Sequence, residues 1–548
     1  MTEQRKRICI VGGVAGGAST AARLRRLDEH AEIIIFERDE HISFANCGLP
    51  YYIGETIMQR EKLLVVTPQL MKNRFNLDVR VFSEVIGVDF ANKTMTVRNT
   101  NTSSYELAYD ALVLSPGAKP LRPPIPGIES SRIMTLRNLA DMDRIKQVID
   151  QSDAQQVVVV GGGYIGIEMA ENVAHRGLKV TVVEAAPHIL APFDTDMVVF
   201  AEQELQANGV ELVLGDSVTA FEENFVTLKS GRQVFADLVI LAIGVQPDTA
   251  FLQDSGLELG PRGHILVNQH MQTNQNGVYA LGDAVEVVHY INQQKTAIPL
   301  AGPANKQGRI VADHICGLDS KYKGTQGTAI IKVFELTAAS TGFNERALQA
   351  TGMKYHVVHV HPNSHAGYYP GASQLSLKLI FGENGEIYGA QAMGKEGVDK
   401  RIDVIATVIR MGGTVDDLTE LELCYAPPFS SAKDPVNLAG FAAQNILVGL
   451  VAVVMPETLL QQLPEGVLLV DVRSAAEHSR GAIPHSLNIP VDELRDRLDE
   501  LHAVDEVWVY CQVGFRGYVA SRILQQYGFQ RVKNISGGYK SYSMLTNH

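Results

Sequence analysis

The chain of 548 residues is long enough for roughly three to four domains. Hydrophobic side chains make up 45% of it, which is enough to fill the cores of those domains. The formal net charge of −13 disfavours non-specific binding to nucleic acids or membrane surfaces, because either would need a basic face.

Cysteines are sparse, and none forms a Cys-x-x-Cys pair: they are Cys9, Cys47, Cys316, Cys424 and Cys511. We therefore expect no metal site. We also expect the protein to lie in a reducing compartment and to have no disulfide framework. The first residues run straight into a strand without the apolar region of a secretory signal. The longest apolar run, residues 446–455, is too short to span a bilayer. These features predict a soluble cytoplasmic protein with no membrane partner.

Two stretches share one order of elements: a strand, a glycine turn, a helix and a second strand that ends at an acid. The first stretch covers residues 8–37 and ends at Glu37, and the second covers residues 157–184 and ends at Glu184. Because βαβ units of this kind build parallel sheets, we expect two Rossmann-like α/β domains.

Residues 326–445 have a different pattern. Residues 329–334 and 375–380 alternate as half-buried antiparallel strands do, and residues 402–411 form a predicted helix that two glycines end. From residue 468 onward a further α/β unit begins. The sequence thus predicts an α+β domain followed by an α/β domain.

The second glycine turn, Gly161-Gly162-Gly163-Tyr164-Ile165-Gly166, fits the pattern G-x-G-x-x-G between a strand and a helix. Gly161 permits the tight turn, Gly163 lets the backbone approach a pyrophosphate, and Gly166 allows close packing of helix on strand. The helix N-terminus offers N–H groups to the phosphates. Glu184 can accept a hydrogen bond from a ribose 2′-hydroxyl and would repel a 2′-phosphate, so NADH is favoured over NADPH.

The first glycine turn, Gly12-Gly13-Val14-Ala15-Gly16-Gly17, departs from this pattern at Val14. Glu37, at the matching strand end, supports a dinucleotide site there. A single turn of this quality is equally compatible with a structural turn in an ordinary α/β domain. Two turns, each followed by its acid, predict two dinucleotide sites.

Residues 280–284 (Ala-Leu-Gly-Asp-Ala) and 109–118 complete a resemblance to the two-dinucleotide flavoprotein disulfide reductases. Residues 1–445 specifically resemble the coenzyme A disulfide reductase branch of that family. The resemblance implies that FAD binds through Gly12, Gly13, Val14, Ala15, Gly16, Gly17, Glu37, Arg38, Ser115, Pro116, Gly117, Gly282 and Asp283. It implies that NADH binds through Gly161, Gly163, Tyr164, Gly166, Glu184 and Gly244, with Tyr164 over the flavin until NADH binds.

The same resemblance implies the order of the domains. Residues 1–118 and 249–325 would form the FAD-binding domain, with the NADH-binding domain, residues 119–248, inserted into it. Residues 326–445 would form an α+β dimerisation domain with an antiparallel sheet, and hence a homodimer. A linker, residues 446–459, would lead to an α/β domain at residues 460–548.

Cys47 lies in the segment Ser43-Phe44-Ala45-Asn46-Cys47-Gly48, which is rich in turn and cap residues. A position near a helix N-terminus or a flavin would lower the pKa of its thiol and favour the nucleophilic thiolate. Ser43-x-x-x-Cys47 resembles the single-cysteine motif of the coenzyme A disulfide reductases, and no second cysteine lies nearby. The resemblance implies that coenzyme A supplies the second sulfur. Cys9, Cys316 and Cys424 are interpreted as structural.

The resemblance also places coenzyme A against a set of polar and basic residues: Arg23, Arg26, Ser43, Asn46, Lys72 and Arg74. From the sequence alone, Arg23 and Arg26 are equally compatible with a solvated helix face. Peroxidase and oxidase relatives carry a histidine where this chain has Ala15, which disfavours a peroxide-reducing function.

Two tyrosines are predicted to reach the active cysteine of the partner subunit by the same resemblance. One is Tyr425, and the other is Tyr368 or Tyr369, of which Tyr369 is preferred. A phenol near a thiolate can give a hydrogen bond or a proton to a leaving sulfur. Interface packing is the alternative role for these side chains.

Residues 460–548 resemble a rhodanese (sulfurtransferase) domain at Asp471-Val472-Arg473, Glu477, residues 481–484 and residues 536–539. Cys511 opens a loop after a predicted strand, and loop N–H groups can converge on a sulfur anion there. Arg516 adds a positive charge that favours a thiolate or persulfide. The alternative is an inactive rhodanese fold used for docking.

The combined prediction is an FAD- and coenzyme A-dependent NADH:disulfide/persulfide reductase. Its partner would be a small sulfur substrate, namely coenzyme A persulfide, polysulfide or coenzyme A disulfide, reduced at Cys47 while Cys511 handles sulfane sulfur. The alternatives are a water-forming NADH oxidase and a redox-sensing or sulfur-carrier protein.

Overall fold

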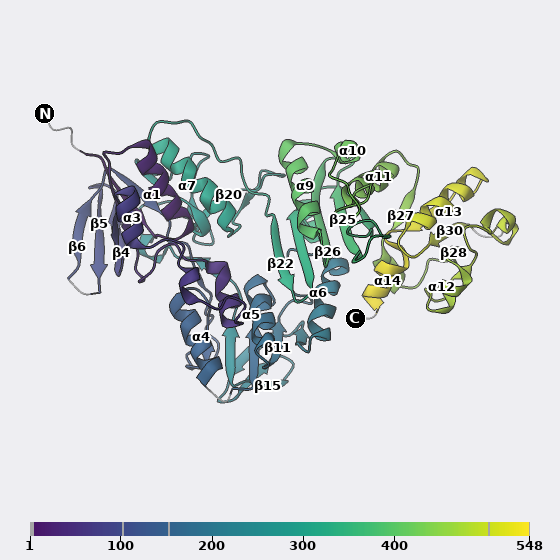
Figure 1. Ribbon diagram of the computed structural model, residues 1–548, viewed down its shortest axis with the longest axis horizontal. Helices are drawn as coiled ribbons and strands as arrows, with labels where there is room; N and C mark the ends of the chain where they lie inside the picture. Colours follow the sequence, from purple (N-terminus) through teal and green to yellow (C-terminus); the bar gives the residue numbers. More distant parts are fainter. Residues whose placement is uncertain (1–4, 101–102, 152–153, 502–504, 547–548) are drawn as a thin grey trace. The chain divides into compact units, whose positions relative to one another are not determined.

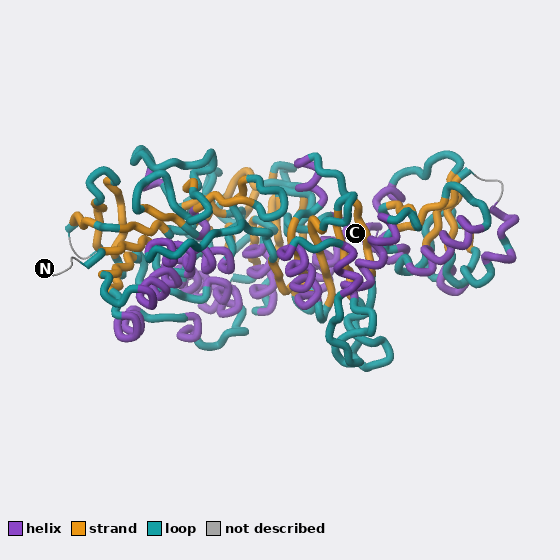
Figure 2. Tube along the Cα trace, turned by 90° about the horizontal axis from the view of Figure 1, so that it is seen from above, coloured by secondary structure: helices purple, strands orange, loops and turns teal. Residues whose placement is uncertain are grey.

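The computed structural model describes residues 5–100, 103–151, 154–501 and 505–546. The chain divides into two compact units, of which the first comprises residues 1–187 and 213–327 and the second residues 188–212 and 328–548. Both units contain strands and helices (Figure 1), and Figure 2 colours the helices purple and the strands orange. Within the described ranges, no helix is long and apolar enough to cross a membrane.

The first parallel sheet of unit 1 has the strand order β19-β7-β1-β2-β3. Its strands are β1 (Arg7–Val11), β2 (Glu32–Phe36), β3 (Asp78–Arg80), β7 (Ala111–Leu114) and β19 (Val278–Ala280). The central strands are almost wholly buried because helices α1 (Ala15–Leu27) and α7 (Ala301–Ile315) pack on the sheet. These two helices also lie against each other (Figure 1).

A second parallel sheet has the order β12-β11-β10-β16-β9. It comprises β9 (Ile133–Met134), β10 (Gln156–Val160), β11 (Lys179–Glu184), β12 (Glu211–Leu214) and β16 (Leu238–Leu241), accompanied by helices α4 (Leu139–Gln151) and α5 (Tyr164–His175). The chain passes between the two sheets through β8 (Ala118–Pro120) and returns through β17 (Val245–Pro247). These two crossing strands pair with each other, as an inserted domain requires.

Smaller elements complete unit 1. Helices α2 (Leu49–Ile53) and α3 (Pro68–Phe75) follow the first βαβ unit. Three small sheets comprise β4 (Ser83–Asp89), β5 (Thr94–Asn99) and β6 (Tyr105–Ala108); β13 (Val218–Phe221), β14 (Phe225–Leu228) and β15 (Gln233–Phe235); and β18 (Ile265–Leu266), β20 (Val285–Val288) and β21 (Lys295–Thr296).

Unit 2 begins with an antiparallel sheet of order β22-β23-β26-β25-β24. Its strands are β22 (Ala329–Val333), β23 (Leu336–Gly342), β24 (His356–Val360), β25 (Leu375–Phe381) and β26 (Ile387–Gly394). Its helices are α6 (Thr195–Ala207), α8 (Glu345–Thr351), α9 (Val398–Met411), α10 (Val415–Glu420) and α11 (Pro435–Leu447). Helix α6 lies between β11 and β12 in the chain, yet it packs in unit 2.

The C-terminal sheet of unit 2 is parallel, with the order β27-β31-β30-β28-β29. It comprises β27 (Ala452–Val454), β28 (Val467–Asp471), β29 (Leu487–Asn488), β30 (Glu506–Tyr510) and β31 (Val532–Ile535), with helices α12 (Ala475–Ser479), α13 (Phe515–Gln526) and α14 (Gly538–Thr546). Because β27 pairs with β31, part of the segment expected to be a linker is an edge strand of this sheet. The α/β fold with an antiparallel α+β domain is confirmed.

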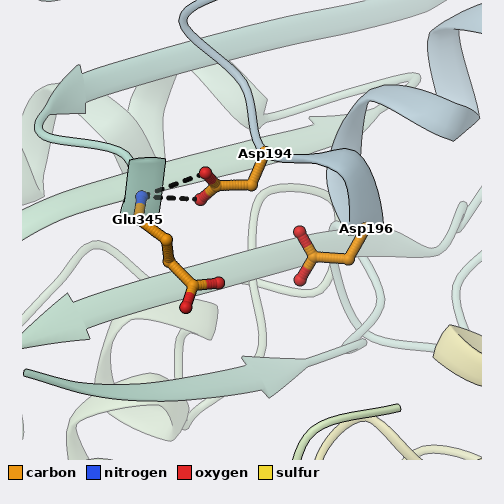
Figure 3. A group of neighbouring side chains, drawn as sticks. All are labelled: Asp194, Asp196 and Glu345. Carbon is orange, nitrogen blue, oxygen red and sulfur yellow. Dashed lines mark hydrogen bonds between the residues drawn. The ribbon is translucent and has the colours of Figure 1, made fainter. Parts of the chain in front are cut away.

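A buried ion cluster holds the start of α6 against the antiparallel sheet. The carboxylates of Asp194, Asp196 and Glu345 lie within 4.8 Å of one another and come from the start of α6 and from α8 (Figure 3). Their spacing would suit a metal ion. However, Nζ of Lys378 on β25 lies 3.1 Å from Asp194, 2.8 Å from Asp196 and 2.5 Å from Glu345. The Lys378 ammonium therefore occupies the position that a metal cation would take between the three carboxylates.

We predict that Lys378→Met lowers the free energy of unfolding by about 3–5 kcal/mol, because it leaves buried carboxylates without their counter-charge. The matched control is Lys354→Met, which removes an exposed pair with Glu383 and is expected to cost about 0–1 kcal/mol. Urea unfolding of the full chain measures both. Equal effects of the two substitutions would contradict the role given to Lys378.

Candidate active sites

The first glycine turn sits at the carboxyl end of β1 and is held by a buried acid. Gly12 has a φ of +91°, and a Cβ there would lie 2.1 Å from the carbonyl oxygen of Ser115. Glu37, at the end of β2, accepts hydrogen bonds from the backbone N–H of Gly13 at 3.0 Å and of Asp39 at 3.1 Å. Burial raises the pKa of Glu37. The acid therefore fixes the turn and keeps lone pairs for a ribose hydroxyl.

The second glycine turn repeats this geometry at the end of β10. Gly161 has a φ of +109°, and Glu184 accepts hydrogen bonds from the backbone N–H of Gly162 at 2.6 Å and of Ala186 at 2.8 Å. A Cβ on Gly166 would lie 1.9 Å from the carbonyl oxygen of Gly161, whereas a Cβ on Gly163 would meet no atom within 4 Å. Gly166 is thus required by packing, and Gly163 faces open space where a pyrophosphate can approach.

The remaining residues expected at these turns lie near them or on the crossing strands. Pro116 and Gly117 follow β7, and Val14 and Tyr164 stand at the starts of α1 and α5. Gly244, with a φ of +116°, accepts a hydrogen bond from the backbone N–H of Leu121 beside the β8–β17 pair. Its position supports the chain crossing, and a role toward NADH stays a prediction.

Arg137 is a charged residue near the first turn that the sequence motifs did not reveal. It follows β9, and a Cβ on Gly117 would lie 2.7 Å from its guanidinium. Burial lowers the pKa of Arg137 while the nearby Asp283 carboxylate opposes that shift. Burial likewise raises the pKa of Asp283, and Arg137 opposes it. Arg38, the residue after Glu37, pairs with Asp248 at 2.6 Å. A half-buried guanidinium beside the first turn suits a diphosphate.

Cys47 is exposed, in a 3-10 turn (Asn46–Gly48) that leads directly into α2. We expected the helix N-terminus or a flavin to lower the pKa of its thiol. In the structure the pKa of Cys47 is instead raised, first by desolvation and then by the negative charges of Glu168 and Asp283. The pKa differs from this expectation because the sulfur is desolvated, and carboxylates from α5 and from residues 282–284, remote in sequence, add to that effect.

Glu168 is a second residue that the sequence analysis missed. It lies on α5, and the hydroxyl of Tyr51 on α2 donates a hydrogen bond to it at 3.5 Å. Burial raises the pKa of Glu168 to about 7. An acid of this strength can both hold and release a proton near neutral pH. The sequence signal was an acid two residues after the last glycine of the second turn.

The residues expected to contact coenzyme A lie on α1, on α3 and before α2. Arg26, Lys72, Arg74 and Asn46 are exposed, and Ser43 is half-buried with a φ of +47°. Arg23 pairs with Asp313 of α7 at 2.8 Å, which reduces its free charge. The buried Arg25 joins α1 to the C-terminal end of α3. Its guanidinium donates hydrogen bonds to the carbonyls of Phe75 at 2.8 Å and Asn76 at 3.0 Å.

Tyr368 and Tyr369, the two candidates for reaching the partner's active cysteine, have different surroundings, and which of them reaches it stays a prediction. The hydroxyls of Tyr368 and Tyr425 lie 3.1 Å apart, and both side chains are exposed. Tyr369 instead packs edge-on against His365, with ring centroids 5.7 Å apart. Of the two candidates left open by the sequence, Tyr368 is the one that the structure brings to Tyr425.

Cys511 is buried in the turn between β30 and α13. The backbone N–H of Gly514 donates a hydrogen bond to its Sγ at 3.2 Å, and Gly514 has a φ of +100°. The Arg516 guanidinium makes two hydrogen bonds to Glu477, at 2.8 Å and 2.6 Å. Glu477 is itself fixed by the cap of α12, where it accepts hydrogen bonds from Ser474. The positive charge that Arg516 brings to the Cys511 loop is therefore already paired with the Glu477 carboxylate. The sequence pattern could not indicate this pairing.

Three family models match the chain in order. The Pyridine nucleotide-disulphide oxidoreductase model matches residues 6–308, the corresponding dimerisation-domain model matches residues 328–435, and the Rhodanese-like domain model matches residues 455–545. The coenzyme A disulfide reductase of Staphylococcus haemolyticus (strain JCSC1435) is 38% identical over 444 residues, which cover 80% of this chain and 100% of that protein.

Two solved structures resemble the whole chain. The reduced Bacillus anthracis CoADR-RHD is 52% identical, with a TM-score of 0.98 and coverage of 99% of each chain. The NAD-dependent persulfide reductase from A. fulgidus is 35% identical, with a TM-score of 0.92 and coverage of 98% of this chain and 100% of that one. These matches confirm the resemblance that the sequence motifs indicated, including its C-terminal domain.

We predict that Glu168→Gln lowers the pKa of the Cys47 thiol. Glu168 is negatively charged above its pKa of about 7, and that charge disfavours the thiolate; the amide carries no charge at any pH. Alkylation by iodoacetamide at slightly alkaline pH should therefore become several-fold faster, because the thiolate is the reacting form.

The experiment uses a Cys424→Ser background, since Cys424 is the other exposed cysteine among the described residues. Glu61→Gln, which removes an exposed acid from the same unit, is the matched control and should leave the rate unchanged. A rate in Glu168→Gln equal to that of the parent protein would contradict the prediction.

Proposed function

Because the chain belongs to the pyridine nucleotide-disulphide oxidoreductase family, and within it to the coenzyme A disulfide reductases, we propose that it is an FAD-dependent NADH:disulfide/persulfide reductase that works as a homodimer. Its substrates are coenzyme A persulfide, polysulfide or coenzyme A disulfide. The observation that carries the proposal is an exposed single cysteine, Cys47, in the 3-10 turn that follows the first βαβ unit, in a chain that also contains a rhodanese-like domain with Cys511. The similarity to an NAD-dependent persulfide reductase supports the same substrate class.

The residues around the first turn fit FAD. Glu37 can accept the ribose hydroxyls, the N-terminus of α1 and Arg137 can bind the diphosphate, and Asp283 can accept hydrogen bonds from the ribityl chain. When bound, FAD supplies the passage of two electrons from NADH to sulfur. At the second turn, the open space at Gly163 and the Glu184 carboxylate suit the diphosphate and adenine ribose of NADH.

Cys47 is the nucleophile of the proposed reaction. Its thiolate attacks one sulfur of the substrate disulfide; a Cys47–sulfur bond forms, the substrate S–S bond breaks, and the second sulfur leaves as a thiolate. With coenzyme A disulfide, the product is a mixed disulfide between Cys47 and coenzyme A. Two electrons from NADH then cleave this bond and restore the Cys47 thiolate and a coenzyme A thiol.

Proton supply in this cycle comes from two places in the chain. Glu168, with a pKa of about 7, holds a proton beside Cys47. The Tyr368–Tyr425 pair offers phenolic hydroxyls on the exposed surface of the dimerisation domain. In a homodimer these hydroxyls protonate the sulfur that leaves from the other active site. Exposed basic residues on α1 and α3 then bind the coenzyme A phosphates.

Cys511 accepts sulfane sulfur in the proposed cycle. Its thiolate attacks the terminal sulfur of a persulfide, the S–S bond breaks, and Cys511 becomes a persulfide while the donor leaves as a thiol. The Gly514 N–H, 3.2 Å from Sγ, is the first of the loop donors that stabilise a sulfur anion there.

We predict that Cys47→Ser abolishes NADH-dependent sulfide release from coenzyme A persulfide, because serine cannot form the mixed disulfide. Cys511→Ser should lower only the turnover of substrates that need sulfur transfer, and should leave reduction of coenzyme A disulfide near the parental rate. NADH consumption at 340 nm and sulfide release measure the two steps separately.

Cys316→Ser is the matched control, because Cys316 is a half-buried cysteine at the end of α7 and should have no effect. Full turnover in Cys47→Ser would refute the proposed mechanism. NADH oxidation that requires oxygen and no sulfur substrate would favour the water-forming oxidase.

We also predict that the enzyme uses NADH at least about tenfold better than NADPH, and that Glu184→Gln reduces this preference by about tenfold, because one like-charge repulsion with the 2′-phosphate is removed. Ratios of kcat/KM for the two cofactors measure the effect. Glu223→Gln, an exposed acid in the same half of unit 1, is the control. An unchanged ratio in Glu184→Gln would contradict the assignment.

A further inference from the structure

Two buried histidines of the dimerisation domain contact the C-terminal domain. His359, on β24, is 4% exposed, and His361, just after β24, is 6% exposed. Oγ of Ser536 lies 2.9 Å from Nδ1 of His359 and also accepts a hydrogen bond from the backbone N–H of His359 at 3.0 Å. Oγ of Ser541, on α14, lies 2.8 Å from Nε2 of His361. Both contacts are buried and join the end of β24 to the C-terminal domain.

Each histidine is fixed from its other side as well. Nε2 of His359 hydrogen-bonds to Asp196, which accepts a further bond from Nζ of Lys378 at 2.8 Å. Because a carboxylate only accepts, this Nε2 carries a hydrogen. His361 is held by Oγ of Ser376 on β25, 2.8 Å from its Nδ1. Every polar atom of the two rings has a partner, so the rings have one orientation.

The two serines flank a turn that supports the Cys511 loop. Between them lie Gly537 and Gly538, with φ values of +68° and +62°. After this turn, the backbone N–H of Tyr539 donates to the carbonyl of Cys511 at 2.7 Å, and that of Lys540 donates to the carbonyl of Gln512 at 2.9 Å.

The turn has no room for a side chain at either glycine. A Cβ on Gly537 would lie 2.8 Å from Nε2 of His361, and a Cβ on Gly538 would lie 2.3 Å from the carbonyl oxygen of Cys511. One turn thus contacts a histidine on one side and the sulfur loop on the other. The loop N–H groups that face a sulfur anion depend on the placement of this backbone.

We propose that His359 and His361 are positioning residues for the Cys511 loop: through Ser536 and Ser541 they hold the Gly537–Gly538 turn, and the turn holds the loop in the shape that accepts sulfur. The dimerisation domain then sets the geometry of the sulfur-transfer site as well as that of the subunit interface. The inference rests on the sulfur-accepting role of Cys511 in the proposed function. No direct contact between either histidine and the sulfur is required.

The test compares His361→Ala with the parent protein in the full chain. The first readout is hydrogen exchange at the amides of Tyr539 and Lys540, which report the two bonds to the Cys511 loop. The second is sulfur transfer from thiosulfate to cyanide. In this reaction the Cys511 thiolate takes the outer sulfur, sulfite leaves, and cyanide then removes the sulfur as thiocyanate. We expect exchange at the two amides to become about tenfold faster and kcat for transfer to fall about tenfold, a change of about 1.4 kcal/mol in each equilibrium or barrier.

Three further variants make the result specific. His361→Gln keeps a side-chain N–H near the position of Nε2 and should restore most of the lost transfer rate. Ser541→Ala removes the same hydrogen bond from the other side, and serves if His361→Ala does not fold. His356→Ala is the matched control, because His356 lies on the same strand and packs against Phe381; it should change neither readout.

Unchanged exchange at Tyr539 and Lys540 in both His361→Ala and Ser541→Ala would overturn the inference, as would equal changes in His356→Ala. A parent protein that transfers no sulfur at all would instead refute the proposed role of Cys511. The exchange measurement would still report whether the histidines position the loop, so the two failures are distinguishable.

Discussion

Both dinucleotide sites depend on one local arrangement, in which a carboxylate at the end of a strand accepts the N–H groups of the neighbouring glycine turn. Glu37 does this for Gly13, and Glu184 does it for Gly162. Each acid is brought beside its turn because the two strands of a βαβ unit are parallel and adjacent. The turn is thereby held open toward a phosphate before any ligand arrives. The other residues of each site lie around one of these two pre-formed glycine turns.

Features that depend on short stretches of sequence were predictable. The glycine turns, their acids, the lone Cys47 and the Cys511 loop all appear as local patterns. The structure places the glycine turns, their acids and Cys511 at strand ends, and Cys47 in a 3-10 turn before α2. A strand-turn-helix pattern fixes its own backbone geometry, so it can be recognised without knowing the rest of the fold.

Features that depend on distant parts of the chain were not predictable. Arg137 reaches the first turn from the segment after β9, and Glu168 affects Cys47 from a helix more than a hundred residues away. The pKa of Cys47 is raised because folding desolvates the sulfur and also brings carboxylates near it, whatever its own neighbours in sequence suggest. The contact between Tyr368 and Tyr425 likewise depends on where folding places Tyr425. Such pairings follow from tertiary packing, which periodicity and local sequence motifs do not report.

The placement of α6 has a consequence for recombining this enzyme with its relatives. The helix is encoded inside the nicotinamide-binding segment, yet it packs in unit 2 and brings Asp194 and Asp196 to Lys378. A chimaera that exchanged everything between the two crossing strands would import a foreign helix into the core beneath β25. Successful swaps must therefore retain residues 188–212 from the recipient, so the boundary for domain exchange lies inside the inserted segment.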